Sequence, residues 1–293
     1  MKQYKFKKLI ILVSILVVLG VAGFAFYHFT RTPHPASSNQ GDSNPETVPE
    51  TTPIPAQEAS QTPTPNPPIL KPKKPVAILM YHSIRVYNNS ADKIGTGLSV
   101  PQSIFDTEMK ALKDSGFQSI SLSNYYSGKL PAKPVVISFD DGYDNAYTQA
   151  FPVLKKYGYI GIFYIITGKI NTTGYLNDLQ IKEMAGSGMI FGDHTISHPD
   201  LTNISNSKLT RELVESKSKL EHLVGSRITD FCYPSGKYNF RVEAAVRSAG
   251  FLTATTTKSP SSLKFSDFLR LPRLRISNTD TARSVLRRVL SIK

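Results

Sequence analysis

Cysteine is nearly absent from the sequence: Cys232 is the only one among 293 residues. A single cysteine excludes an intrachain disulfide, so the chain is not one of the small disulfide-stabilised scaffolds. The N-terminal segment contains no cysteine, which also excludes a lipoprotein anchor at that end.

The chain also lacks any recognisable motif for binding DNA or RNA. Its 35 lysines and arginines exceed its 22 acidic residues, for a net charge of +13. Without a motif, this basic surplus does not predict a nucleic-acid partner. It suits an anionic cell wall or membrane surface, or it is ordinary surface charge. No segment indicates a protein partner.

Charged residues are absent from residues 9–27, and these 19 residues are enough for one helix to cross a hydrocarbon core of ~30 Å. Residues 1–8 carry four lysines, which predicts a cytoplasmic N-terminus with the rest of the chain outside. The alternative is a cleaved signal peptide, with Gly23 to Ala25 as a poor cleavage site, and the protein would then be secreted. Export without disulfides fits a bacterium that does not rely on them. We therefore expect a single-pass protein of the bacterial cell membrane with its folded part extracellular.

Large apolar residues are scarce in residues 28–75, which hold 12 of the 20 prolines together with Thr, Ser, Gln and Asn. Such a composition cannot bury a core and favours extended polyproline II structure. At ~3.1 Å per residue, the segment would span on the order of 100 Å when fully extended. We interpret it as a spacer that lets the domain in residues 76–293 reach a target such as a cell wall.

From Val76 onward, short apolar stretches alternate with amphipathic ones. Strands are predicted at residues 76–82, 134–139, 160–166, 189–195, 228–234 and 251–257. Helices are predicted at residues 103–116, 145–158 with a kink at Pro152, 176–188, 205–225, 239–250 and 281–292. This alternation predicts an α/β fold with a parallel sheet, either a distorted (β/α) barrel or a doubly wound open sheet.

In both architectures ligands bind at the C-terminal ends of the strands. Polar side chains follow four of the predicted strands, so we expect them to share one pocket: His82, Asp140 with Asp141, His194 with His198, and Tyr233 to Gly236.

His194 and His198 are spaced i, i+4, which on a helical turn places both imidazoles within reach of one ion. Two histidines and one carboxylate are a common open ligand set for a divalent metal. Either Asp140 or Asp141 supplies that carboxylate, and the other is then free to accept a proton. Taken separately, a histidine pair of this spacing is weak evidence, and a strand ending in Asp-Asp-Gly is more often a solvated turn.

The stretches SFDDG, residues 138–142, and HTISH, residues 194–198, resemble the first two motifs of the NodB-type polysaccharide deacetylases, carbohydrate esterase family 4. The resemblance covers residues 76–293. It implies a distorted (β/α) barrel that removes N- or O-acetyl groups from polysaccharides. It also implies one divalent metal ion, most often Zn²⁺, with Co²⁺ or Ni²⁺ as alternatives.

Residue by residue, the resemblance implies that Asp140 is the general base and that Asp141, His194 and His198 bind the metal. FCYPSG, residues 231–236, resembles the third motif of the family. By that resemblance the backbone N–H of Tyr233 holds the oxyanion, and Pro234, Ser235 and Gly236 contact the substrate.

The sequence departs from the family pattern at three places. The arginine of the third motif is absent, and Phe231 or Cys232 lies near its place. The fourth motif is not visible in residues 251–260, and the fifth lacks its histidine in residues 270–276. Arg270, Arg273 or Arg275 is a candidate to replace the missing arginine beside Asp140, unless these three are plain surface residues.

One subgroup, the exported poly-N-acetylglucosamine deacetylases, has a Tyr-His pair on the first strand and the third motif F-x-Y-P-x-G. Tyr81-His82 and residues 231–236 match both features. By this resemblance His82 is the general acid; the alternative is a histidine with only a structural role at a strand end.

These observations predict a metal-dependent hydrolase that removes N-acetyl groups from an N-acetylglucosamine polymer, either peptidoglycan or poly-N-acetylglucosamine. Its partners would be the N-acetylated polysaccharide and the membrane that holds residues 9–27. A glycan-binding pseudoenzyme of the same fold is an alternative, because of the altered third and fifth motifs. A deacetylase of esters or of small acetylated molecules is another.

Overall fold

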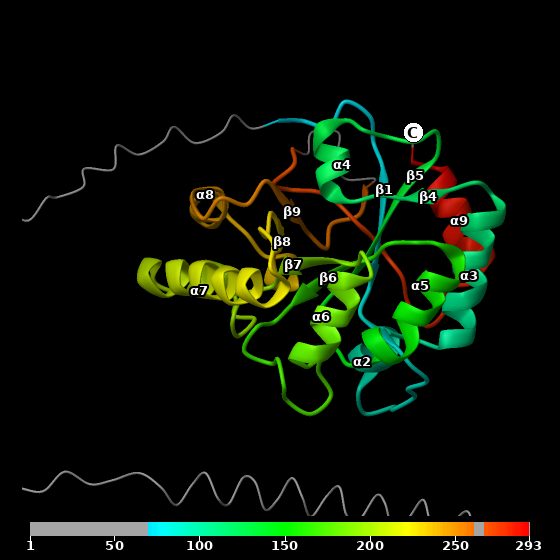
Figure 1. The fold of residues 1–293 in the computed structure, drawn as a ribbon, viewed down its shortest axis with the longest axis horizontal. Helices are drawn as coiled ribbons and strands as arrows, with labels where there is room; N and C mark the ends of the chain where they lie inside the picture. Colours follow the sequence, from blue (N-terminus) through cyan, green and yellow to red (C-terminus); the bar gives the residue numbers. More distant parts are fainter. Residues whose placement is uncertain (1–69, 261–266, 293) are drawn as a thin grey trace, which may run out of the picture. The chain divides into compact units, whose positions relative to one another are not determined.

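The structure is a computed structural model of the chain, and it describes residues 70–260 and 267–292 (Figure 1). These residues belong to one compact unit, Thr62–Lys293. The predicted membrane-spanning stretch, residues 9–27, and nearly all of the predicted linker lie outside the described residues. Within the described ranges, no helix has the length and apolar character that crossing a membrane requires.

Eight strands form one parallel sheet in the order β10-β1-β5-β6-β7-β8-β9, with β4 also paired to β5. The six strands predicted from the sequence are all present, and β4 and β10 are too short to have been predicted. The bounds are β1 Ala77–Tyr81, β4 Gln118–Ser119, β5 Pro134–Phe139, β6 Ile162–Ile165, β7 Ile190–Asp193, β8 Asp230–Cys232, β9 Thr253–Thr255 and β10 Leu274–Arg275. A separate pair consists of β2 Ser83–Ile84 and β3 Ser99–Val100.

From β1 through β5 to β9, the order of the strands in space follows their order in the chain. Right-handed crossovers that all advance in one direction place their helices on one face, so the sheet curls with its helices outside (Figure 1). A doubly wound sheet reverses its order, so that alternative is wrong and the α/β, barrel-like curl is confirmed. Residues 268–276 bond to both β9 and β1: Ala254 N donates to Phe268 O (2.7 Å), and Ile276 N donates to Met80 O (3.0 Å).

The helices surround the curl in two groups. One group is α9, α3 and α5, and the other is α6, α7 and α8. Consecutive helices within each group are in contact. Their bounds, with α2 and α4, are α2 Lys93–Gly97, α3 Gln102–Asp114, α4 Leu122–Ser127, α5 Phe151–Tyr157, α6 Asp178–Gly186, α7 Asn206–Val224, α8 Phe240–Ser248 and α9 Ala282–Leu290. The irregularity expected at Pro152 is a π-helical turn just before it, Ala146–Ala150, in which Phe151 N bonds to Ala146 O. Single 3-10 turns occur at Leu201–Asn203 and Pro234–Gly236.

Alternate residues of each strand pack on opposite faces of the sheet. Leu79, Ile137 and Phe163 belong to the large core cluster that includes side chains of the outer helices. Their neighbours Ile78, Val136 and Tyr164 belong to a second cluster on the other face. Val136, Ser138 and Asp140 are spaced two residues apart, so they lie on the same, inner face of the curled sheet. This inner face therefore changes from apolar to polar toward the C-terminal ends of the strands.

Candidate active site and metal centre

Asp140 directly follows β5 and forms an ion pair with Arg273 across the inside of the curl. Arg273 Nη1 donates to Oδ1 and Nη2 donates to Oδ2, both at 2.6 Å. Both side chains are buried, Arg273 at 0% and Asp140 at 3% exposure. Arg273 is itself held by Thr256 O (2.9 Å) and Ser138 Oγ (3.2 Å). The carboxylate is therefore fixed in position by a planar, bidentate contact.

Burial alone would raise the pKa of the Asp140 carboxyl. The charge of the Arg273 guanidinium and its hydrogen bonds outweigh that effect and hold the pKa well below its usual range. Asp140 is consequently ionised throughout the physiological pH range.

The structure distinguishes the three arginines that are candidates to pair with Asp140. Arg273 lies against Asp140, whereas Arg270 pairs with Asp267 and lies 3.4 Å from Glu243. Arg275 is exposed, and its carbonyl oxygen accepts a hydrogen bond from Arg288. Arg270 and Arg275 are therefore not partners of Asp140.

His82 follows β1 and lies next to the same carboxylate, with Nε2 at 3.8 Å from Asp140 Oδ2. Its side chain is only 11% exposed, and its Nδ1 is buried without a hydrogen-bond partner among the described residues. Burial lowers the pKa of His82, and the negative charges of Asp140 and Asp141 partly oppose this. His82 thus lies in contact with Asp140 as a neutral imidazole near pH 7.

Asp141, His194 and His198 bring three potential ligand atoms within 4.8 Å of one another. Asp141 Oδ1 lies 3.5 Å from His194 Nε2 and 3.9 Å from His198 Nε2. His194 Nδ1 lies 2.7 Å from the carbonyl oxygen of Cys232, which can only accept a hydrogen bond. Nδ1 must carry the proton in that contact, which leaves Nε2 free to bind a metal ion.

This set of three residues fits a divalent metal ion. Two ligands of one zinc ion, at bond lengths of about 2.0–2.2 Å, lie no more than about 4.4 Å apart. The distances of 3.5 and 3.9 Å from Asp141 Oδ1 meet that condition. His198 is 31% exposed, so the cluster is open to solvent on one side, as a catalytic site requires.

The loop that carries the histidines is not the helical turn that the i, i+4 spacing predicts. Residues 194–198 have no helical assignment, and Thr195 and His198 have φ angles of 69° and 57°. Asp141 also has a positive φ, 73°. Non-glycine residues in this region cost of order 1–3 kcal/mol each, and they persist only where surrounding contacts hold them.

A second cluster of potential ligands, Asp140, His194 and Cys232, is completely buried. Arg273 occupies both oxygens of Asp140, and its Nη2 lies 3.2 Å from Cys232 Sγ. A metal ion there would lie against a guanidinium charge, so the Asp141 cluster is the better metal site. Arg273 thus lies beside Cys232, near the place where the sequence lacks the arginine of the third motif.

The stretch after β8 differs in detail from the expected oxyanion site. The backbone N–H of Tyr233 donates to Thr255 O (3.1 Å) as part of the pairing with β9, so it is not available to a substrate. Pro234 to Gly236 form a single 3-10 turn, in which Ser235 has a φ of 54°. Gly236 also has a positive φ, and a Cβ atom at this position would overlap Thr257.

Sequence reasoning missed several residues around the site. Ser138 and Thr256 hold Arg273. Ser138 is the first residue of the SFDDG motif, which implies no role for it, and no motif includes Thr256. Tyr143 and Tyr175 stack with ring centroids 5.2 Å apart, close to Asp141, and both are half-buried. Tyr143 is two residues after Asp141 in the sequence, and an isolated antiparallel bridge with Tyr143 brings Tyr175 to it from a distant loop.

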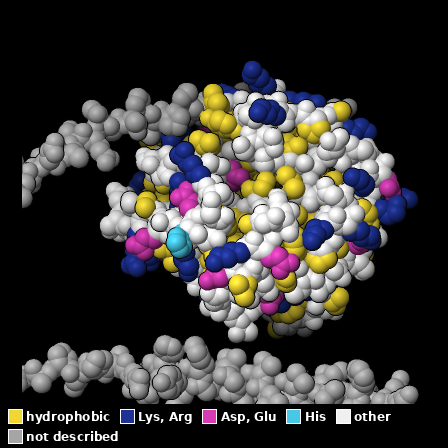
Figure 2. All heavy atoms as spheres, in the orientation of Figure 1, with side chains coloured by type: hydrophobic (Ala, Val, Ile, Leu, Met, Phe, Trp, Pro, Cys, Tyr) yellow, Lys and Arg dark blue, Asp and Glu magenta, His cyan; other side chains and the backbone are white. Residues whose placement is uncertain are grey.

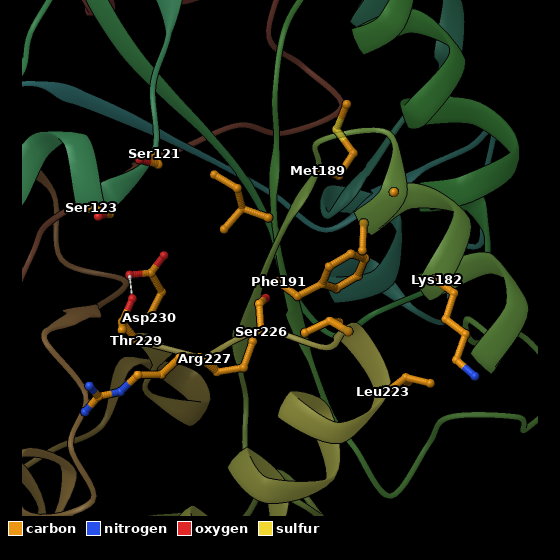
Figure 3. A pocket seen from close by; sticks show the side chains of 15 residues that line it. Ser121, Ser123, Lys182, Met189, Phe191, Leu223, Ser226, Arg227, Thr229 and Asp230 are labelled. Atoms are coloured by element: carbon orange, nitrogen blue, oxygen red, sulfur yellow. Dashed lines mark hydrogen bonds between the residues drawn. The ribbon is translucent and has the colours of Figure 1, made fainter.

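A cavity of about 740 Å³ lies elsewhere, near the starts of β7 and β8 (Figure 3). Met189, Phe191, Arg227 and Asp230 are among the residues that line it. Because the acids and histidines follow the ends of the strands, this cavity is at the opposite end of the sheet from the site. Lysine and arginine side chains are scattered over the visible face rather than collected in one patch (Figure 2).

Comparison with known proteins agrees with this geometry. The family model for polysaccharide deacetylase matches residues 127–254. YxkH of Bacillus subtilis (strain 168), which carries the same family name, is 34% identical over 215 residues, 71% of this chain and 74% of YxkH.

The poly-beta-1,6-N-acetyl-D-glucosamine N-deacetylase of Staphylococcus aureus (strain N315) is 28% identical over 302 residues, 94% of each chain. The structure of the Streptococcus pyogenes deacetylase PplD in complex with acetate has a TM-score of 0.67 and 30% identity, and the match covers 73% of this chain and 97% of PplD. The motifs, the curled sheet and these similarities together show that the chain belongs to the NodB-type polysaccharide deacetylase family.

Proposed function

We propose that the protein is a metal-dependent hydrolase that removes N-acetyl groups from an N-acetylglucosamine-containing polysaccharide of the cell wall or extracellular matrix. The observation that carries this proposal is the open Asp141, His194 and His198 cluster beside an ionised Asp140. The similarity to the Staphylococcus aureus enzyme along 94% of both chains favours poly-N-acetylglucosamine over peptidoglycan.

Asp141, His194 and His198 would hold the ion, with Zn²⁺ the best match to their nitrogen and oxygen donors. A bound divalent ion supplies an acidified water and polarises the carbonyl oxygen of the acetyl group. Asp140 then accepts the proton of the attacking water, because it is ionised and fixed by Arg273.

Amide hydrolysis also requires a proton on the departing nitrogen. The low pKa of Asp140 means that its carboxyl does not retain a proton, whereas an imidazole binds one more tightly. His82 Nε2 lies 3.8 Å from Asp140 Oδ2, which is too far for a hydrogen bond, so a proton taken by Asp140 would pass through one intervening water to His82 and from there to the amine. The neutral His82 of the free enzyme is the form that can receive it.

The oxyanion needs donors other than the Tyr233 N–H, which is bonded within the sheet. We assign this role to the N–H of Ser235, which forms no hydrogen bond with the described part of the chain. Its left-handed φ and the close fit of Gly236 against Thr257 fix the direction of this peptide. Pro234 and Gly236 would border the bound sugar.

A glycan-binding pseudoenzyme is the second candidate, because the third and fifth motifs lack the residues that the family normally has there. The Arg273–Asp140 pair argues against it, because it restores the contact that the missing arginine would make. We further propose that residues 9–27 anchor the enzyme in the bacterial cell membrane and that residues 28–75 extend the domain toward its polymer.

The test is release of acetate from defined polymers: poly-N-acetylglucosamine, peptidoglycan and a polymer carrying only O-acetyl esters. We expect release from the first, and loss of both activity and bound metal in His194→Ala and His198→Ala, as measured by elemental analysis. Release from the ester polymer alone would reject an N-deacetylase. Full metal occupancy in both variants would reject the ligand set.

A further inference from the structure

The histidine-bearing loop, residues 194–198, needs an external support because its backbone is unfavourable by itself. Thr195 and His198 both have left-handed φ angles. Inside the loop, Thr195 Oγ1 accepts from His198 N (2.9 Å), and this is a local contact. A ligand loop of this kind presents two imidazoles in one geometry only if neighbouring elements hold it.

Glu212 of α7 makes the most extensive side-chain contact with that loop. Its Oε2 accepts from the backbone N–H groups of Ile196 (2.9 Å) and Ser197 (3.0 Å), and its Oε1 accepts from Ser197 Oγ (2.7 Å). Glu212 is 5% exposed, so its carboxylate lies largely away from bulk water, although Ser197 itself is exposed. Charge-assisted bonds to backbone N–H groups are stronger than neutral ones.

The opposite side of the loop is attached to the segment after β6. Thr167 N donates to Thr195 O (3.0 Å), and Gly168 N donates to Ile196 O (2.9 Å). A Cβ atom on Gly168 would lie 2.5 Å from Ile196 O, so only glycine permits this approach. The loop is thus held between two elements. Two carboxylates hold its backbone: Asp193 Oδ1 accepts from Thr195 N (2.9 Å), and Glu212 accepts from Ile196 and Ser197.

We propose that Glu212 is a positioning residue that holds the loop in its metal-binding conformation before the metal arrives and so sets the metal affinity. This inference rests on the metal site of the proposed function. Glu212 does not touch the ion; it acts through the peptides between His194 and His198. Outer partners of this kind typically change metal affinity 10- to 100-fold when they are removed.

The experiment measures the zinc Kd of the full-length protein, stripped of metal and titrated against a competing chelator. We expect Glu212→Ala to raise the Kd about 10- to 100-fold and Glu212→Gln, which keeps the shape and one acceptor, to restore much of the affinity. Glu215→Ala is the matched control, because Glu215 lies on the same helix, is 59% exposed and, among residues 70–260 and 267–292, pairs with Arg211 alone. It should leave the Kd unchanged.

If Glu212 had a merely structural role, Glu212→Ala would lower the melting temperature of the metal-free protein but would bind zinc with the wild-type Kd. That result would overturn the proposal. If Glu212→Ala does not fold, Ser197→Ala decides, because it removes one of the three bonds from an exposed residue. Its Kd should rise roughly two- to tenfold, and an unchanged Kd would reject the role. A wild-type protein that binds no zinc would instead refute the proposed function itself.

Discussion

At the scale of single residues, the site depends on a carboxylate that remains charged although it is buried. An isolated buried charge is costly, and removing one partner of a buried pair leaves that cost unopposed. Arg273 satisfies both oxygens of Asp140 and is itself held by Thr256 and Ser138. This ion pair therefore offsets the cost of burying the Asp140 carboxylate and also fixes the group that we propose as the general base.

Arg273→Gln should lower the free energy of unfolding by about 3–5 kcal/mol, because Asp140 would remain buried without its cation. The measurement is urea unfolding at pH 7. The double variant Asp140→Asn with Arg273→Gln should recover part of this loss, since it buries no charge. A double variant as unstable as Arg273→Gln alone would contradict this account.

His82→Ala should reduce kcat by roughly 10²–10⁴-fold on an N-acetylated polymer, the usual range for a lost acid or base. Metal content and thermal stability should stay near wild type, because His82 is not a ligand and its Nδ1 has no partner among the described residues. The loss should be milder on an activated acetyl ester, whose leaving group needs little protonation. An equal loss on both substrates would indicate that His82 acts in binding.

At the scale of elements, α3 packs on β1 through a buried carboxyl group that lies away from the site. Tyr81 of β1 donates to Glu108 Oε2 (2.8 Å), and Glu108 Oε1 is buried without a partner among the described residues. Burial raises the pKa of Glu108 from 4.5 to about 7, although the bond from Tyr81 opposes this. The folded protein therefore binds this proton more tightly than the unfolded chain.

Because the folded pKa of Glu108 is the higher one, its deprotonation destabilises the fold as the pH rises from about 4.5 to about 7. Glu108→Gln should remove that slope, which amounts to at most about 3 kcal/mol. The check is the free energy of unfolding of both proteins from pH 4.5 to 8. Parallel curves over this range would show that Glu108 does not titrate there.

At the scale of the whole molecule, the described residues include every predicted strand and helix after residue 75. The curl is continuous from β1 to β9, and residues 268–276 contact both of these strands. Leu70 O accepts from Phe268 N (3.2 Å), so contacts of the domain extend a few residues before Val76. We therefore propose that the domain begins near residue 70 rather than at the predicted residue 76.

A fragment of residues 70–293 should fold by itself, because the two core clusters found among the described residues both lie within it. We expect cooperative thermal unfolding and the same zinc Kd as the full-length protein in detergent. A shorter fragment that starts at residue 76 should be less stable, since it loses the contacts of Leu70 and of Lys74 O with Tyr125. An unfolded 70–293 fragment beside a folded full-length protein would move the boundary toward the N-terminus.

The sequence alone determined where the main strands and helices lie and which residues are candidates for the metal site and the active site. Apolar alternation marks the six main strands, and SFDDG and HTISH are runs of consecutive residues, so both signals are local and readable. His82, Asp140, Asp141 and the two histidines each follow a strand, and the parallel sheet brings such positions to one edge.

Only the tertiary structure decided which arginine meets Asp140, because Arg273 and Asp140 are 133 residues apart and meet inside the curl. It also decided that the histidine loop is left-handed rather than helical, since Glu212 and Gly168 hold it there from other elements. The commitment of the Tyr233 N–H to β9 likewise depends on strand pairing. Contacts between distant segments leave no periodic pattern in the sequence, so they appear only once the chain has folded.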